Sequence, residues 1–266
     1  MIDPRTGGGR STASAEASVW RVVRKTSTAS TNLDVLDLAR LGDPGRVWVV
    51  ADAQDGGRAR RGRSWTSEPG NLYASALLID PGIPEHLPEL PFVAAVTAAE
   101  AVTAATGGRL SPALKWPNDL MLAGRKLAGI LLETTRTPDG RIAVAVGIGI
   151  NCRHHPAGTE MPATNLLIEG ADLRPEVLFE ALRDAFARRV AEWDGGRGFP
   201  AIRSAWLERA VGIGTTIRVR LVDGEDHGIF DGIDAAGLLL LARPDGSRRK
   251  ISAGDVFFPA AKDRSW

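Results

Sequence analysis

A hairpin signature near the middle of the chain constrains the fold more than any other feature. Residues 110–114 form an apolar run that indicates a buried strand, and Lys115-Trp116-Pro117-Asn118-Asp119-Leu120 follows it. Proline fixes its own φ and moves the preceding residue towards extended geometry, so we expect the strand to stop there and open into a turn. The apolar pattern resumes from Lys126 to Glu133, which predicts the second strand of the hairpin. Gly129 within that strand indicates close approach by a ligand or another backbone.

Three charged residues gather at the open end of this hairpin. Lys115 and Lys126 lie on facing parts of it and can both point at one anionic centre. Asp119 is the best candidate for a metal ligand, because one carboxylate together with substrate phosphates is enough for Mg²⁺. We therefore interpret the hairpin as the wall of an anion-binding site. The alternative is an ordinary hairpin with a solvated tip.

Composition limits the classes of partner. The 266 residues carry a formal net charge of +1, so no overall field points to bulk nucleic-acid or membrane binding. Cys152 is the only cysteine, which excludes a disulfide framework and a CxxC site and favours a reducing compartment. No stretch has the roughly 18 uninterrupted apolar residues of a membrane span. We expect a cytoplasmic protein whose residues 1–18, rich in Gly, Ser, Thr and Ala, form a disordered tail.

Local patterns predict an α+β chain of two domains. The expected strands are 20–26, 47–51, 71–79 and 141–151, and the expected helices begin near Leu33 and span 91–106 and 173–193. Ser30 or Thr31 can cap the first helix. From about residue 211 short strands alternate with Asp/Gly turns, which is typical of a small all-β barrel. The predicted domains are therefore 19–210 and 211–266.

The segment Gly57-Arg58-Ala59-Arg60-Arg61-Gly62-Arg63-Ser64-Trp65 is rich in glycine and arginine. Such a loop suits closure over a phosphate or carboxylate, and we expect it to order when it binds one. Trp65 either offers a flat face to a ring such as adenine or is a core residue. The loop and the two lysines together give the charge pattern for activation of a carboxylate by ATP. The rival interpretation, contact with RNA, is disfavoured by the near-neutral chain.

These motifs resemble those of the biotin protein ligase family. The central hairpin motif, the arginine-rich loop, Ser30-Thr31-Asn32, Gly147-Ile148-Gly149-Ile150-Asn151 and Thr164-Asn165-Leu166 occur in the family's order. The resemblance implies a catalytic domain with a mixed sheet flanked by helices, of the class II synthetase-like biotin/lipoate ligase fold, and a small SH3-like C-terminal barrel. It also implies that biotin, ATP and Mg²⁺ give biotinyl-5′-AMP. The biotin then passes to a lysine of the biotin carboxyl carrier domain of acyl-CoA carboxylases.

The resemblance assigns roles to individual residues. Biotin would contact Ser30, Thr31, Gln54, Gly57, Arg58, Lys126 and Gly129. ATP or the adenylate would contact Arg58, Arg60, Arg63, Trp65, Asn118, Lys126 and Asn151. Lys126, Arg60 and Lys115 would be catalytic, and Asp119 would bind the metal.

Two departures from the family pattern carry expectations. Ala59 stands where the family usually has glycine, which predicts altered retention of the adenylate. Only residues 1–19 precede the resembling region, too few for the winged-helix domain of the family's repressors, so we expect an enzyme that binds no operator DNA. The alternatives are a lipoate or octanoate ligase, which carries a different lysine motif, and a regulatory biotin-binding module, which would have lost Lys126 or the arginines. A Cys152–His dyad is disfavoured because neighbouring residues of an extended segment point to opposite sides.

Overall fold

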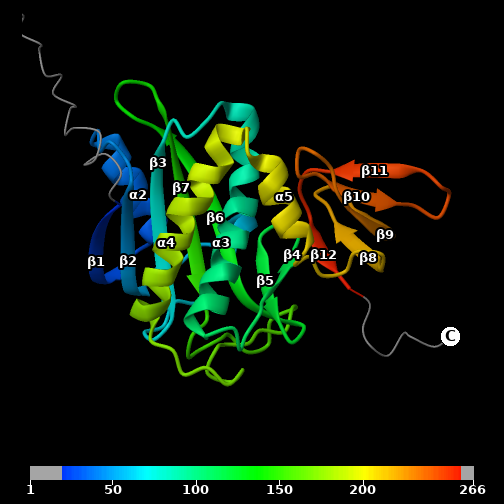
Figure 1. The fold of residues 1–266 in the computed structure, drawn as a ribbon, viewed down its shortest axis with the longest axis horizontal. Helices are drawn as coiled ribbons and strands as arrows, with labels where there is room; N and C mark the ends of the chain where they lie inside the picture. Colours follow the sequence, from blue (N-terminus) through cyan, green and yellow to red (C-terminus); the bar gives the residue numbers. More distant parts are fainter. Residues whose placement is uncertain (1–19, 259–266) are drawn as a thin grey trace, which may run out of the picture.

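The computed structural model describes residues 20–258, so the predicted disordered tail lies outside the described residues. Its centre is a seven-stranded mixed sheet (Figure 1). In spatial order the strands are β1 (Arg21–Thr28), β2 (Val47–Gln54), β3 (Leu72–Ile79), β7 (Ile142–Ile150), β6 (Arg125–Arg136), β5 (Asp119–Leu122) and β4 (Ala113–Lys115). The first two strands run parallel and all other neighbours antiparallel. The predicted mixed sheet is confirmed.

Helices cover both faces of the sheet. Helix α2 (Thr31–Arg40) lies on one face, and α3 (Leu90–Ala105), α4 (Pro175–Trp193) and α5 (Phe199–Leu207) lie on the other (Figure 1). Strand β2 shows how alternation serves both layers: Val47 and Val49 pack under α2, whereas Trp48 and Val50 belong to the larger core on the α3 and α4 side. Short 3₁₀ turns span Arg60–Gly62 (η1), Pro84–Glu89 (η2) and Asp194–Gly196 (η3).

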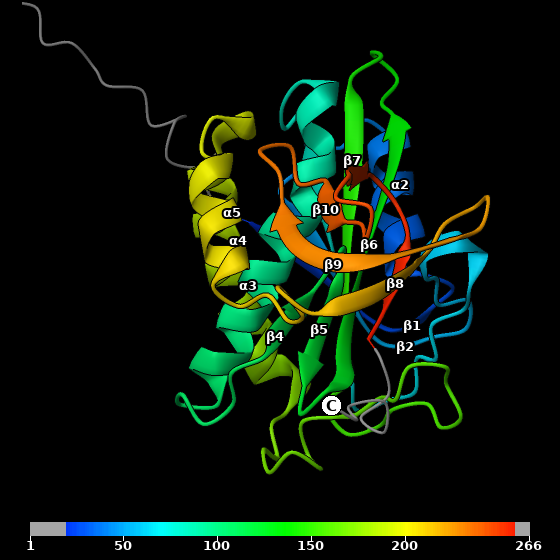
Figure 2. The same cartoon turned by 90° about the vertical axis from the view of Figure 1, so that its right-hand side faces the viewer.

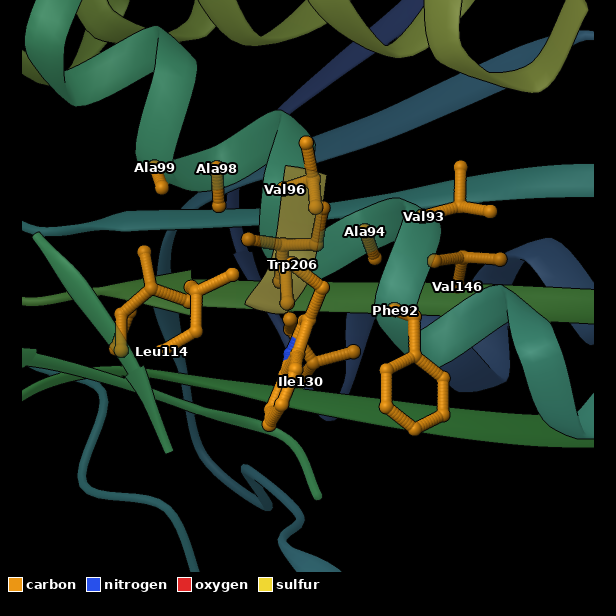
Figure 3. Close-up of a cluster of buried hydrophobic side chains, with 14 of the residues drawn as sticks. Phe92, Val93, Ala94, Val96, Ala98, Ala99, Leu114, Ile130, Val146 and Trp206 are labelled. Atoms are coloured by element: carbon orange, nitrogen blue, oxygen red, sulfur yellow. The ribbon is translucent and has the colours of Figure 1, made fainter. Parts of the chain in front are cut away.

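Helix α3 is apolar around its whole circumference because it is buried between other elements. Figure 3 shows its side chains, among them Phe92 and Ala98, clustered with residues of β6 and β7 and with Trp206 of α5. The segment Pro84–Ala105 is long and apolar enough to cross a membrane by composition alone. Most of it is instead buried inside the protein, which accounts for its composition without a membrane.

The C-terminal part is a separate five-stranded antiparallel sheet beside α5 and β4 (Figures 1 and 2). Its strands are β8 (Thr216–Arg220), β9 (Glu225–Ile233), β10 (Leu239–Ala242), β11 (Arg248–Ile251) and β12 (Asp255–Phe257). The Trp116 indole Nε1 donates a hydrogen bond of 3.1 Å to the Gly237 carbonyl, and the Leu114 amide donates to Arg209 across the edge of β4. The second sheet is therefore joined directly to the hairpin motif.

Local expectations failed at four places. The predicted two-stranded hairpin contains an additional strand, β5, in the gap between the two apolar runs, because a second tight turn at Ala123 (φ 48°) and Gly124 (φ 72°) separates it from β6. The first strand is correspondingly shorter than residues 110–114 suggested. Ser30 occupies the N-cap position of α2, but its side chain makes no capping hydrogen bond. Helix α5 and strand β12 were missed altogether.

Candidate active site

Three glycines form the floor of the candidate site on the α2 face of the sheet. Gly129 of β6 is paired directly with Gly149 of β7. A Cβ atom on Gly129 or Gly149 would lie 2.9 Å or 2.8 Å from the Trp65 indole, so the missing side chains leave room for that flat ring. Gly147, two residues before Gly149, leaves room in the same way for the side chain of Asn32. The glycine alternation of β7 therefore creates a slot against the backbone.

The arginine hairpin, residues 57–65, is a folded β-hairpin that closes over this floor. The amide of Trp65 donates to the Gly57 carbonyl (2.9 Å), and the amide of Ala59 donates to Arg63 (2.8 Å). Arg61 (φ 57°) and Gly62 (φ 70°) both adopt left-handed geometry, as the two central residues of a type I′ turn do. This turn is common in β-hairpins with two-residue loops, because its twist matches that of the flanking strands. Its folded backbone fixes where each arginine projects.

Ion pairs and hydrogen bonds anchor the arginines to three other elements. Arg60 donates to the Asn118 side-chain oxygen (3.0 Å), and Arg61 and Arg63 pair with the two oxygens of Asp255 on β12. Arg58 pairs with Glu133 of β6 at 3.0 Å. Burial lowers the pKa of the Arg60 guanidinium, with Asp255 and Asp119 opposing the shift. The hairpin is thus held by both sheets.

A buried carboxylate lies between two lysines at the cationic end of the cavity. The Lys126 ammonium is 2.5 Å from one oxygen of Asp119, and the Lys115 ammonium is 3.6 Å from the other. Burial lowers the pKa of Lys115, which is only 4% exposed, and Asp119 counteracts this. Burial would raise the pKa of Asp119, but Lys126 and Lys115 outweigh it and hold the pKa below its usual value. Lys115 and Lys126 thus converge with Asp119 between them, and the anionic ligand expected at this point stays a prediction.

Uncharged polar groups line the opposite end, at the N-terminus of α2. The Gln54 side-chain oxygen accepts hydrogen bonds from the amide (2.9 Å) and the hydroxyl (3.1 Å) of Thr31. The Gln54 side-chain nitrogen donates to Ser67 (2.9 Å). Ser30 lies beside them in the cavity wall. This end can therefore recognise a neutral polar ring, whereas the lysine end recognises an anion.

A cavity of about 420 Å³ connects the two ends. All predicted site residues line it except Gly57, which lies at the base of the hairpin, where a Cβ would come within 2.2 Å of the Trp65 carbonyl. Asn151 is buried and donates to the Thr164 carbonyl (3.0 Å). Trp65 Nε1 is a buried donor without a hydrogen-bond partner in residues 20–258. The structure thus brings the predicted set together.

Sequence reasoning missed several wall residues. Asn32, Tyr73, Met161, Asp255 and Phe257 also line the cavity. Asp255 and Phe257 come from the C-terminal sheet, far from the other wall residues in sequence. They flank the buried Val256 on β12, and this alternation was the available signal that both side chains lie on the face of the strand turned away from the core. Cys152, in contrast, is buried outside the cavity wall, and burial raises the pKa of its thiol to about 12, so it is no nucleophile at neutral pH.

Comparisons with known proteins agree with this architecture. Residues 19–152 match the model of the Biotin/lipoate A/B protein ligase family, and residues 212–258 match the Biotin protein ligase C terminal domain. The chain is 43% identical over 237 residues to the biotin–[acetyl-CoA-carboxylase] ligase of Paracoccus denitrificans, covering 87% of this chain and 98% of that protein. It is 34% identical to the bifunctional ligase/repressor BirA of Bacillus subtilis, covering 85% of this chain and 70% of that protein.

A solved structure supports the same assignment. The biotin protein ligase from Aquifex aeolicus in complex with biotin and ATP superimposes with a TM-score of 0.76 and 26% identity, over 89% of this chain and 97% of that one. Fold, site and sequence therefore define a ligase of the biotin and lipoate class. The chain belongs to the biotin protein ligase family. The predicted family, fold class and enzyme class are confirmed.

Proposed function

We propose that this protein activates biotin with ATP to biotinyl-5′-AMP and transfers the biotinyl group to a lysine of the biotin carboxyl carrier domain of an acyl-CoA carboxylase. The observation that carries the proposal is the polarity of the 420 Å³ cavity. A neutral polar end at Thr31 and Gln54 and a cationic end at Lys115 and Lys126 are joined by a flat glycine floor. Biotin has a neutral ureido ring at one end and a carboxylate at the other, which matches this order.

The subsites follow from the chemistry of each wall. Ser30, Thr31 and Gln54 would hydrogen-bond the ureido ring, and Gly129 would leave room for the ligand beside the Trp65 ring that lies over it. Arg58, Arg60, Arg63 and Lys126 would hold the carboxylate and the α-phosphate. Trp65 would stack on adenine, with Asn118 and Asn151 at the phosphate and the base. Lys126 Nζ already lies 5.4 Å from the centroid of the Trp65 ring.

In the first step, a biotin carboxylate oxygen attacks the α-phosphorus, and the bond to the β-phosphate breaks, releasing pyrophosphate. Negative charge on the α-phosphate during transfer of the adenylyl group is stabilised by the arginines, which the hairpin fixes before the substrate arrives, and by Lys126. Lys126 can break its ion pair with Asp119 and pair with the α-phosphate instead. In the second step, the neutral amine of the carrier lysine attacks the acyl carbon, the bond to AMP breaks, and the amine loses its proton to solvent.

Magnesium enters this proposal with the nucleotide, as MgATP. Residues 20–258 contain no group of three or more His, Cys, Asp or Glu side chains that could hold a metal. Both oxygens of Asp119 face ammonium groups, so a resident metal does not fit the site. A cation that contacts Asp119 would have to displace one lysine, and the direct metal role of Asp119 stays a prediction.

The single, buried thiol Cys152 suits a reducing compartment, and we extend the proposal to a cytoplasmic location.

Intact-mass analysis of a carrier domain tests the proposal. The domain is incubated with this protein, ATP, Mg²⁺ and equimolar biotin and lipoate. We expect a gain of one biotinyl group, which disappears when the acceptor lysine is changed to arginine. The matched enzyme control is Lys126→Ala, which should lose activity and keep a normal melting curve. Gain of lipoyl groups, or no gain despite biotin binding by calorimetry, would contradict the proposal.

A further inference from the structure

Glu133 of β6 contacts two parts of the site without lining the 420 Å³ cavity, and it lines a neighbouring pocket together with residues of the arginine hairpin. One carboxylate oxygen is 3.0 Å from the Arg58 guanidinium, and the other accepts a hydrogen bond of 3.0 Å from the Asn32 side-chain amide. The side chain is 19% exposed, so both contacts are partly shielded from water. Glu133 therefore joins the arginine hairpin to the helix α2 side of the site.

Asn32 continues this connection towards the neutral end of the cavity. It is buried, and its side-chain oxygen accepts a hydrogen bond of 2.6 Å from the Ser75 hydroxyl. Ser75 is also 2.7 Å from the Thr31 hydroxyl, which in turn contacts Gln54. Polar contacts therefore run without a break from Gln54, at the proposed ureido subsite, to Glu133 and Arg58.

The other arginines of the hairpin have anchors of their own. Asn118 holds Arg60, and Asp255 holds Arg61 and Arg63. Glu133 anchors Arg58 in the same way. It also accepts a hydrogen bond from Asn32, which connects to the proposed biotin end of the cavity. We propose that Glu133 is a positioning residue for biotin: it holds the Arg58 and Asn32 side chains in place relative to each other. The inference rests on the proposed function, since it assigns a role within that site.

The geometry requires a carboxylate at this position. Both partners, the Arg58 guanidinium and the Asn32 NH₂ group, are donors, and a carboxylate accepts from both. A glutamine has one oxygen and one NH₂ group, so whichever way its amide is turned, one donor faces another donor. Glu133→Gln therefore breaks one of the two links although its shape is unchanged.

Biotin-dependent exchange between ATP and pyrophosphate measures the effect. We expect Glu133→Gln to raise the KM for biotin about fivefold, the scale of one partly shielded ionic contact, with kcat changed less than about twofold. The KM for ATP should rise less than that for biotin, because Arg58 also faces the proposed α-phosphate site whereas Asn32 connects only to the biotin end. Glu133→Ala, which removes the acceptors without adding a donor, is measured in parallel. The matched control is Glu180→Gln, whose carboxylate pairs with Arg24 on the exposed surface at 3.3 Å. It should behave as the wild type, and all variants should melt within a few degrees of it.

A double-mutant cycle separates positioning from a structural role. If Glu133 acts through Arg58, then Glu133→Gln should cost less than about twofold in an Arg58→Ala background. Equal increases in the KM values of biotin and ATP, additive effects in the cycle, or a Glu133→Gln variant identical to the wild type would each overturn the inference alone. A wild-type protein without biotin-dependent exchange would instead overturn the proposed function and this inference with it.

Discussion

Replacing Asp119 by asparagine removes the negative charge that lies between two ammonium groups. Lys115 is 4% exposed and cannot exchange its lost partner for water, whereas Lys126 is 25% exposed and can. Breaking a buried ion pair by removing one partner costs about 3–5 kcal/mol, because an uncompensated charge remains inside. Against a total stability of about 5–15 kcal/mol, this change is large. We expect Asp119→Asn to lose about 3 kcal/mol at pH 7.

The pKa shifts of Asp119 and Lys115 predict in which direction the free energy of unfolding changes with pH. The pKa of Asp119 is lower in the folded than in the unfolded protein, so its contribution is complete above its ordinary value of 3.8 and is lost as pH falls through the folded pKa. That acidic loss should vanish in Asp119→Asn. The folded pKa of Lys115 is also depressed, so the unfolded state holds that proton more tightly and stability rises with pH from the folded pKa towards 10.5. Without Asp119 this rise should begin at lower pH.

Urea unfolding between pH 3 and 10 measures both effects. Asp37→Asn is the control, since Asp37 pairs with Arg40 on the surface, where such a pair contributes at most about 1 kcal/mol. Adding Lys115→Met to Asp119→Asn should recover much of the stability, because the orphaned charge is removed with its partner. Wild-type stability in Asp119→Asn, or no recovery in the double variant, would refute the reasoning.

Four further expectations concern other contacts of the site. Gly149→Ala places a Cβ 2.8 Å from Trp65 Nε1, so it should raise the KM for ATP and cost about 1–3 kcal/mol by thermal unfolding. Asp255→Ala frees two arginines and should speed limited proteolysis within the arginine hairpin. Cys152, whose thiol pKa is raised to about 12, should resist a thiol reagent at pH 8 until the protein unfolds. Because the folded state holds the thiol proton more tightly, the contribution of Cys152 to the free energy of unfolding is complete below the ordinary pKa of 9.0 and is lost as pH rises towards 12. Ala59→Gly should speed release of biotinyl-5′-AMP about two- to fivefold, measured by gel filtration with labelled biotin.

Local patterns predicted the elements whose periodicity is uninterrupted. The all-round apolar sequence of α3 and the continuous apolar run of β7 follow from their burial, and both were found close to their predicted bounds. The pattern around β5 failed because this buried strand is only four residues long and is closed by the Ala123-Gly124 turn before β6 begins. Alternation alone gave no reason to place a reversal there.

The site was predictable where neighbours in sequence are neighbours in space. Lys115 and Asp119 face each other across one tight turn, and the next strand brings Lys126 to the same carboxylate. Asp255 and Glu133 were missed because their roles depend on pairing with the arginine hairpin from other parts of the chain, 192 residues away for Arg63 and Asp255. A carboxylate in isolation carries no signal of the arginine it will meet.

The departure at Ala59 illustrates how backbone geometry decides what a sequence difference means. The residue has φ −129° and ψ 174°, an extended conformation that any residue adopts, so its Cβ causes no strain in the folded hairpin. Left-handed geometry is required instead at Arg61 and Gly62. Alanine at a compatible position restricts the unfolded chain more than glycine and stabilises by about 0.4–1 kcal/mol. A folded hairpin favoured by this amount covers the bound adenylate for longer, so the alanine should strengthen retention rather than weaken it.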